Sequence, residues 1–197
     1  MLDQLIDRLR HHQPAMPDQA SAEASVLVPV TNDREPRIIL TRRALTMNSH
    51  AGEVAFPGGK KDAQEPDLLV TALRESEEEI GLPRDAVRLL GRLGTLQSRA
   101  GIRVTPWVGL VPPDVPLIAN PQELDAIFQV PIAFFRGTPM QADHVIRWQG
   151  GEYVMPTWRY DGHMIWGLTA YIIVDLLNTA YDAGLVVPLP AAQRNAG

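Results

Sequence analysis

The amino-acid sequence predicts one α/β domain, in which a mixed sheet is covered by helices. Its 197 residues suit a single domain with decorations at either end. Short apolar runs typical of strands alternate with segments of helical period, and no internal repeat is found. This order favours an α+β or α/β/α layered arrangement.

The first ten residues have the pattern of a short amphipathic helix. Apolar side chains alternate there with charged ones, unlike the continuous apolar segment of a signal peptide. A polar stretch that contains prolines follows. We therefore expect a helix and linker arm over 1–22, a main domain over 23–187 and a disordered tail over 188–197.

Two strands are expected to open the main domain. The apolar run 26–30 has the composition of a buried strand, and 37–41 that of a second strand. The polar residues 31–34 between them are a turn signal. Residues 44–55 show no clear period and are predicted to form a long loop ahead of a pair of glycines.

A helix is predicted over 67–80, because apolar side chains recur there at helical spacing. The side chains expected to pack against the core are Leu69, Ala72, Leu73, Ser76 and Ile80. Those expected to face away from it are Thr71, Glu75, Glu78 and Glu79. Gly81 is a natural helix end, and Pro83 lies just beyond it.

The chain then returns to strands. Residues 87–96 and 104–111 are strand-like and are joined by the loop 97–103. Residues 123–130 lead into another strand, and a short helix is expected to start within 131–135.

A hairpin and a last helix are expected near the C-terminus. A pair of glycines lies between the strand-like runs 145–148 and 153–160, which is a hairpin signal. Apolar residues at helical spacing over 165–180 predict the helix. This segment carries Asp175 and is shorter than the roughly 20 apolar residues of a membrane span, so we expect a soluble, cytoplasmic protein.

The composition excludes several classes of function. The net charge of −5 argues against a general nucleic-acid binder, but it is compatible with a small anionic ligand in a cleft of opposite local charge. The chain has no cysteine, which excludes disulfides, thiolate metal sites and a cysteine nucleophile.

The most informative feature is a set of three glutamates in the helix 67–80. Glu75, Glu78 and Glu79 lie at positions i, i+3 and i+4, so their carboxylates fall on one side of the helix. Carboxylates this close repel one another. A hard divalent cation such as Mg²⁺ turns that repulsion into ligation by oxygen. The pattern therefore predicts a metal-dependent enzyme that acts on phosphates.

The same segment resembles the Nudix box. That signature is a Gly, a Glu and then Arg-Glu-U-x-Glu-Glu-x-Gly-U, where U is aliphatic or small; here it comprises Gly59, Glu65 and the run 74–82. The usual box has seven residues between the first Glu and the Arg, whereas eight separate Glu65 from Arg74. The resemblance implies a Nudix-type α/β/α sandwich and the activity of a Nudix pyrophosphohydrolase.

The resemblance also implies roles for individual residues. The implied ligands of Mg²⁺ or Mn²⁺ are Glu75, Glu78, Glu79 and the Gly59 carbonyl, with Glu78 or Glu79 as the base. Arg74 is expected to pair with a carboxylate of the box and orient it, without touching substrate. The two glycines, Gly58 and Gly59, let the backbone approach metals and phosphates.

An upstream stretch is similar to the extra motif of coenzyme A pyrophosphatases within this superfamily. Residues 39–59 keep every spacing of Leu-Leu-Thr-x-Arg, Ser or Ala, three residues, Arg, three residues, Gly, three residues and Phe-Pro-Gly-Gly. This likeness implies hydrolysis of coenzyme A or a derivative to 3′,5′-ADP and 4′-phosphopantetheine. Asn48 stands where the motif has its second arginine, and asparagine cannot make a charge-assisted phosphate contact.

Further candidates lie outside the glutamate helix. The residues expected to bind substrate are Arg42, Arg43, Asn48, His50, Gly58, Arg99 and Arg103. Glu123 and Asp125 lie where some Nudix enzymes place an extra base or metal ligand. The tryptophans that can stack on adenine or pack in the core are Trp107, Trp148, Trp158 and Trp166.

Two alternative functions stay open. A Nudix hydrolase of ADP-ribose, dinucleotides or nucleoside triphosphates is favoured by Asn48. A non-catalytic nucleotide-binding module is a second alternative, against which the intact Glu75, Glu78 and Glu79 argue. The expected partner is a small-molecule nucleotide, without nucleic acid or membrane, and a homodimer is the default assembly.

Overall fold

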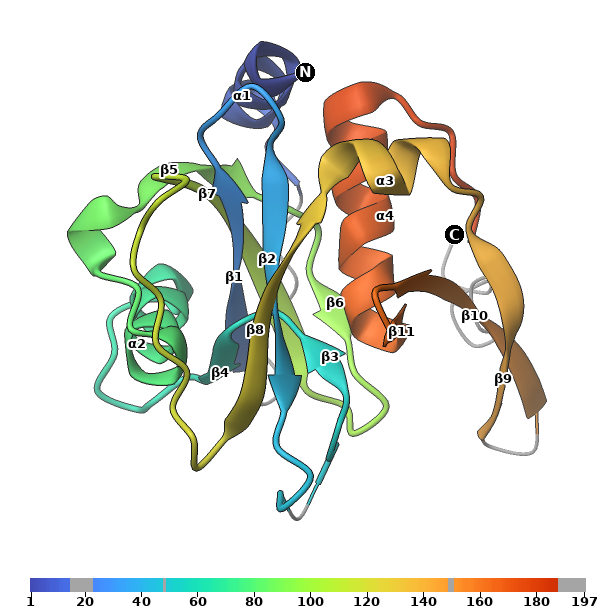
Figure 1. The fold of residues 1–197 in the computed structure, drawn as a ribbon. Coiled ribbons are helices and arrows are strands. Elements are labelled where there is room, and N and C mark those ends of the chain that lie inside the picture. The colour runs from blue at the N-terminus through green and yellow to red at the C-terminus, as the bar shows by residue number, and fades with distance from the viewer. Residues whose placement is uncertain (15–22, 48, 149–150, 188–197) are drawn as a thin grey trace.

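The structure is a computed structural model, which describes residues 1–14, 23–47, 49–148 and 151–187 (Figure 1). Asn48, residues 15–22 of the expected helix and linker arm, and the tail over 188–197 lie outside the described residues. The predicted fold class is confirmed. A large mixed sheet stands between helices, and a smaller sheet is attached at one side.

The large sheet has eight strands in the described part of the chain. Its central path runs in the order β3–β2–β1–β7–β5, and three further strands pair with members of this path. The path consists of β1 (Glu23–Thr31), β2 (Arg37–Arg43), β3 (Val54–Ala55), β5 (Arg88–Arg92) and β7 (Arg103–Val111). The others are β4 (Gly58–Lys60) beside β1, β6 (Leu96–Gln97) beside β7, and β8 (Leu124–Pro131) beside β2.

Strand β1 lies at the centre of this sheet. It runs parallel to β7 and antiparallel to β2 and β4. Successive side chains of a strand point to opposite faces. Accordingly Leu27 joins the apolar cluster beneath α2, whereas Val28 and Val30 join the larger cluster on the other face. The apolar run predicted as a buried strand is thus buried on both faces, as a central strand requires.

Helices cover both faces of the sheet (Figure 1). Helix α2 (Leu68–Ile80) lies on one face, where Ala72 and Ile80 pack with Leu27, and the 3-10 turn η1 (Arg84–Ala86) follows it. The other face carries α1 (Leu2–His11), α3 (Ile132–Gly137) and α4 (Gly167–Tyr181). No helix among the described residues is long and apolar enough to cross a membrane.

Helix α1 is built into the hydrophobic core. Leu5 and Leu9 are fully buried in the same cluster as the apolar side chains of α4. The backbone also comes close to β5, since a Cβ at Gly91 would lie 2.7 Å from the Leu9 carbonyl oxygen. At the far end of the helix, Arg8 forms an ion pair with Asp182, which lies just after α4.

A small antiparallel sheet consists of β9 (Gln141–Trp148), β10 (Gly151–Tyr160) and β11 (His163–Trp166). The predicted hairpin is confirmed by β9 and β10. The last helix starts at Gly167, so the prediction of a helix from 165 is wrong at its start. Ile165 belongs to β11, where it pairs with Trp158, and Gly167 has a left-handed φ of 63° that turns the chain into α4.

Candidate functional site

Helix α2 holds its glutamates in fixed positions because both of its ends are closed. At the N-terminus the Asp67 carboxylate accepts a 2.9 Å hydrogen bond from the Val70 N–H. At the C-terminus Gly81 is left-handed, with φ 66°, and its N–H bonds back to the Glu77 carbonyl at 3.0 Å. The helix end predicted at Gly81 is confirmed, and the glutamates occupy the last two turns.

Strand β4 brings the glycine pair against these glutamates. A Cβ at Gly59 would lie 2.4 Å from the Glu75 carboxyl carbon, so only glycine leaves room for that carboxylate. Gly58 has φ +156°, and a Cβ there would lie 2.3 Å from the Ser25 carbonyl oxygen of β1. The Gly58 N–H donates a 3.1 Å hydrogen bond to Oε2 of Glu79. The backbone of β4 therefore lies directly against two carboxylates of α2.

Arg74 is paired with four carboxylates, of which that of Asp62 is the most distant at 3.8 Å. Its Nε donates to Oε1 of Glu65 at 2.8 Å, and its two terminal nitrogens lie 2.9 Å from carboxylate oxygens of Glu75 and Glu78. The Arg74 side chain is only 19% exposed, so these contacts are partly shielded from water. Arg74 thus has the contacts of an orienting residue for the helix carboxylates.

Glu65 anchors this arginine despite its unusual spacing. Its Oε2 accepts hydrogen bonds from the Thr71 hydroxyl at 2.7 Å and from the Asp62 N–H at 2.9 Å. The hydrogen bond from Arg74, followed by those of Thr71 and Asp62, lowers the pKa of Glu65 to about 2. The extra residue before α2 is therefore accommodated in the loop without separating Glu65 from Arg74.

The prediction that Thr71 and Glu79 face away from the core is wrong. Thr71 is fully buried because its hydroxyl bonds to Glu65, and Glu79 is 3% exposed because it turns toward Gly58. Helical spacing identifies a face but cannot show that a polar side chain finds a buried partner. The sequence feature that could have indicated this burial is the hydroxyl of Thr71, which can accept or donate a hydrogen bond one helical turn before Glu75.

Burial and mutual repulsion control the charge of two carboxylates. Burial, helped by the nearby Glu75 and Glu123 carboxylates, raises the pKa of Glu79 to about 7. The Gly58 N–H and Arg43 act in the opposite direction. Burial also raises the pKa of Glu75, with added contributions from Glu78 and Glu123, while Arg74 opposes the shift. Glu75 and Glu79 thus belong to a buried acidic cluster in which carboxylates outnumber their positively charged partners.

Glu123 reaches this cluster through a tethered loop. The Ile118 and Asn120 N–H groups donate to the Ile80 and Glu79 carbonyls at 2.9 and 2.8 Å, so the loop closes the end of α2. The Glu123 carbonyl then accepts a 2.8 Å hydrogen bond from the Ala44 N–H after β2. Of the two distal-loop candidates, Glu123 is the one that acts on the carboxylates of α2, because Asp125 is paired with Arg42 instead.

The oxygen-rich donor set suits a hard divalent cation. However, among residues 1–14, 23–47, 49–148 and 151–187, no group of three His, Asp or Glu side chains has an arrangement that holds a metal ion. Arg74 accounts for this, since it holds Glu75 and Glu78, while Glu79 bonds to the Gly58 N–H. Metal binding by these residues thus requires Glu75 and Glu78 to exchange Arg74 for the cation.

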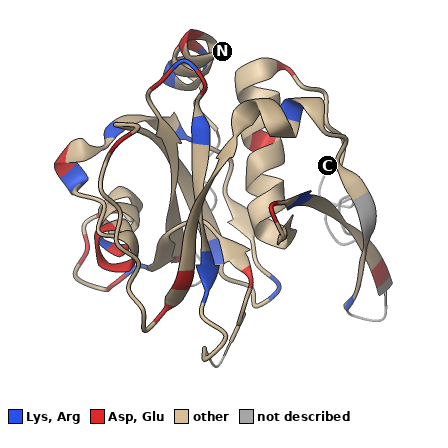
Figure 2. Cartoon of the chain, in the orientation of Figure 1, with Lys and Arg blue, Asp and Glu red and all other residues tan. Residues whose placement is uncertain are grey.

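The two neighbouring arginines of β2 have different surroundings. The Arg42 Nε bonds to Oδ1 of Asp125 at 2.6 Å, and this hydrogen bond raises the pKa of Arg42. Arg43 acts electrostatically on Glu79, and its buried Nε has no hydrogen-bond partner among the described residues. In Figure 2 acidic colour gathers on α2 and basic colour at the lower end of β2. Arg43 therefore borders the carboxylate cluster, whereas Arg42 is held by β8.

The remaining candidates lie apart from the cluster. Arg103 is paired with Glu23 at 3.2 Å, His50 with Glu53 at 2.8 Å, and Arg99 is exposed in a turn between β6 and β7. Across the described ranges, none of these three cationic side chains makes a hydrogen bond or ion pair with the glutamates of α2. Of the residues predicted from the sequence, the structure thus brings Gly58, Gly59 and Arg74 together with the glutamates of α2. Arg43 borders this group.

Comparison with known proteins places these features in context. A family model described as the NUDIX domain matches residues 22–146. A protein of Photorhabdus laumondii subsp. laumondii, named "Uncharacterized Nudix hydrolase NudL", is 39% identical over 180 residues, 89% of this chain and 95% of that protein. One of the same name from Yersinia enterocolitica is 42% identical over 176 residues, 87% of this chain and 89% of that protein.

The fold has solved counterparts as well. The crystal structure of a MutT/nudix family protein from Enterococcus faecalis matches with a TM-score of 0.55 at 16% sequence identity. The match covers 87% of this chain and 66% of the Enterococcus faecalis chain. At this level of identity the likeness concerns the fold alone.

Proposed function

The chain belongs to the Nudix hydrolase family, and on this premise we propose that it cleaves the diphosphate bond of coenzyme A or a derivative. As a Nudix hydrolase it acts on nucleoside diphosphate derivatives with the help of divalent metal ions. In the proposed reaction water adds to one phosphorus of the diphosphate and the bridging P–O bond breaks. The products are 3′,5′-ADP and 4′-phosphopantetheine.

The position of Arg43 is the observation that carries this substrate assignment. Arg43 is the first arginine of the upstream motif, and it lies close enough to Glu79 to affect the charge of that carboxylate. Its buried Nε has no hydrogen-bond partner among the described residues, and the half-buried guanidinium has further N–H donors that can bind an anionic group. The upstream motif therefore borders the carboxylate cluster, as a motif that selects a phosphorylated substrate should.

The residues of α2 and β4 supply the catalytic part of the proposal. Glu75, Glu78, Glu79 and the Gly59 carbonyl are the proposed ligands of Mg²⁺ or Mn²⁺. A bound ion of this kind neutralises diphosphate charge and lowers the pKa of a coordinated water. Glu79 is buried at the centre of the cluster beside Glu123, which favours it over the exposed Glu78 as the proton acceptor. Arg74 is a positioning residue that stays bound to Glu65.

Product identification by mass spectrometry tests the proposal. Pure protein with Mg²⁺ or Mn²⁺ is incubated separately with coenzyme A, ADP-ribose, NADH and a nucleoside triphosphate. The expected result is release of 4′-phosphopantetheine, fastest from coenzyme A and lost in Glu79→Gln. The matched control is Glu77→Gln, because Glu77 lies on the same helix but pairs with Arg84 at 2.8 Å, away from the cluster. Faster turnover of another substrate would overturn the coenzyme A assignment.

Asn48 allows a second test by gain of function. The upstream motif has arginine at this position, and a guanidinium can add a charge-assisted phosphate contact that asparagine cannot. Asn48→Arg is expected to lower KM for coenzyme A and to leave KM for ADP-ribose unchanged. The expected difference arises because coenzyme A carries a 3′-phosphate that ADP-ribose lacks. An equal fall in KM for ADP-ribose would show that position 48 does not select this phosphate.

A further inference from the structure

We propose that Trp166, together with His144, forms the surface on which the nucleobase of the substrate stacks. This inference rests on the proposed function, since it names the part of the protein that holds the base of a nucleoside diphosphate derivative. It concerns the junction between the large and small sheets, which lies apart from the carboxylate cluster of α2.

The other tryptophans with described side chains have structural contacts. Trp158 is 1% exposed, donates its indole N–H to the Thr138 carbonyl at 3.2 Å and packs edge-on against Phe135. Trp107 packs with the apolar cluster beneath α2. Trp166 is half-buried and belongs to neither apolar cluster. Trp107 is also half-buried, but its ring packs with that cluster, so Trp166 is the better placed of the two to offer a ring face to a ligand.

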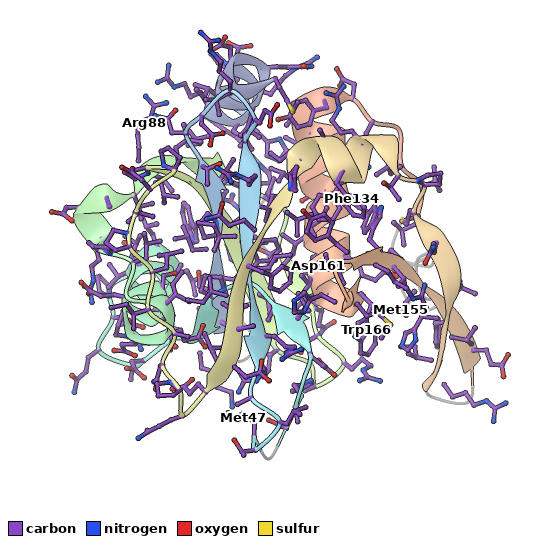
Figure 3. The ribbon with its side chains drawn as sticks, viewed as in Figure 1. Met47, Arg88, Phe134, Met155, Asp161 and Trp166 are labelled. Atoms are coloured by element: carbon purple, nitrogen blue, oxygen red, sulfur yellow. The ribbon has the colours of Figure 1, made fainter. Side chains whose placement is uncertain are left out.

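Trp166 lies next to the start of α4, which is bonded to the strand β3 that leads into Gly58 and Gly59. It ends β11 and immediately precedes α4, whose Thr169 hydroxyl bonds to the Val54 carbonyl of β3 at 2.9 Å. Val54 pairs with Arg42 of β2, and β3 continues through residues 56–57 into β4. Figure 3 shows Trp166 and Met155 on the small sheet near the start of α4. Strand β3 therefore lies between the start of α4, next to Trp166, and β2, which carries Arg43.

The aromatic pair is suited to stacking. The His144 and Trp166 rings lie 4.4 Å apart between centroids at 65°, an edge-to-face contact. Such a contact covers at most one face of a ring and leaves the other face available. Any nucleobase can stack on an aromatic face. Met155 lies directly opposite His144 in the β9–β10 register and is largely buried.

A second ring contact makes this surface rigid. His163 of β11 stacks on Phe128 of β8 with centroids 3.9 Å apart and planes 5° from parallel. The small sheet is thereby fixed to the large one, and Trp166 is held relative to β2 and β3. A rigid aromatic surface binds a base at a lower cost in conformational entropy than a mobile one.

The location also fits a role in substrate selection. The matched NUDIX domain ends at residue 146, so Trp166 lies outside the segment that carries the shared chemistry. Family members that share a catalytic centre but differ in substrate need their selecting groups elsewhere. A base-stacking residue on the adjoining small sheet meets that need.

Substrate analogues and Trp166 variants test the inference. Intrinsic fluorescence is titrated with 3′,5′-ADP and, separately, with 4′-phosphopantetheine, and KM and kcat are measured with the best substrate found above. We expect 3′,5′-ADP to quench the wild-type fluorescence and 4′-phosphopantetheine to have no such effect. Trp166→Ala is expected to raise KM about 10-fold or more with kcat nearly unchanged, because base stacking on an aromatic side chain is lost.

Two further variants keep the test specific. Trp166→Phe is expected to lose the quenching but to retain KM within about threefold, since phenylalanine still offers a ring face. The matched control is Val145→Ala, an exposed apolar residue of the same sheet, which is expected to behave as wild type. Unchanged KM in Trp166→Ala would overturn the inference even if the enzyme cleaves coenzyme A. Conversely, quenching by ADP-ribose in an enzyme inactive on coenzyme A would support the stacking surface while the proposed substrate fails.

Discussion

The Gly58 N–H donates a hydrogen bond of 3.1 Å to Oε2 of Glu79 across the junction of β4 and α2. This bond satisfies one oxygen of a carboxylate that is only 3% exposed. It also fixes the distance between the glycine pair and the helix. The charge on Glu79 therefore affects both the stability of the junction and the chemistry proposed for it.

The first prediction concerns the pH dependence of stability without divalent metal. The pKa of Glu79 is about 7 in the folded protein against an ordinary value of 4.5, so its contribution to stability is fully present below pH 4.5 and is lost as the pH rises through 7. Glu79→Gln, which cannot ionise, is expected to raise the free energy of unfolding at pH 8 by up to about 3 kcal/mol relative to wild type. The gain should shrink toward pH 5.

Urea unfolding at pH 5 and pH 8 in the presence of EDTA measures this difference. Glu77→Gln serves as the control, because the exposed Glu77 pairs with Arg84 on the outer side of the helix. Equal pH dependence in wild type and Glu79→Gln would contradict a raised pKa for Glu79. Added Mg²⁺ is expected to stabilise the wild type more than the variant.

The second prediction concerns Glu65. Its pKa is lowered to about 2, so its contribution is present above pH 4.5 and is lost as the pH falls toward 2. Glu65→Gln is expected to destabilise the protein by about 2 kcal/mol at pH 7, because a charge-assisted bond to Arg74 is weakened. It is also expected to lower kcat at least 10-fold, since Arg74 loses its anchor.

Unfolding at pH 7 and pH 3, combined with steady-state kinetics, separates the two effects. At pH 3 the stability difference between wild type and Glu65→Gln should be smaller than at pH 7. A kcat equal to that of wild type would show that Arg74 is oriented without Glu65. Glu77→Gln is the matched control, because it removes a carboxylate of α2 that pairs with Arg84 and not with Arg74.

The third prediction concerns Gly59. A Cβ at this position would lie 2.4 Å from the Glu75 carboxyl, which is the end of a flexible side chain, so Gly59→Ala is expected to fold and to displace that carboxylate. Activity should fall at least 100-fold, and more Mg²⁺ should be needed for half-maximal rate. Gly137→Ala is the control, since a Cβ at Gly137 has nothing within 4 Å. Retained activity in Gly59→Ala would remove Glu75 from the proposed site.

The fourth prediction separates the two arginines of β2. Arg43→Ala is expected to raise KM for coenzyme A about 10-fold to 100-fold, since a guanidinium beside the diphosphate is lost. Arg42→Ala is expected to change KM less than threefold, because Arg42 is already bonded to Asp125 and is directed toward β8. Steady-state kinetics on both variants provide the comparison. The reverse ranking would assign substrate binding to Arg42.

Much of this architecture follows from local patterns in the sequence. Three elements were predictable because period and turn chemistry are local properties. They are the strand 26–30, the helix that ends at Gly81 and the β9–β10 hairpin. The start of α4 was not, since the apolar Ile165 fits a helical spacing but is held in β11 by pairing with Trp158. Tertiary pairing overrides a short periodic signal.

The candidate site shows the same division. The spacing of Glu75, Glu78 and Glu79 identifies the helix face without reference to the rest of the chain. The burial of Glu79 and Thr71 depends on Gly58 and Glu65, which belong to other segments, so no local pattern could reveal it. The distinct surroundings of Arg42 and Arg43 likewise become visible only when β8 and α2 are in place.

The burial of Leu5 and Leu9 has a practical consequence for work on this protein. The matched family segment starts at residue 22, yet the helix at residues 2–11 fills part of the space between α4 and β5. A chain shortened to the family segment would expose the apolar surface that these leucines cover, and it should aggregate or unfold at lower temperature. The start of the matched family segment is therefore not the boundary of the cooperative folding unit, and a purification tag belongs before Met1 rather than in place of the helix.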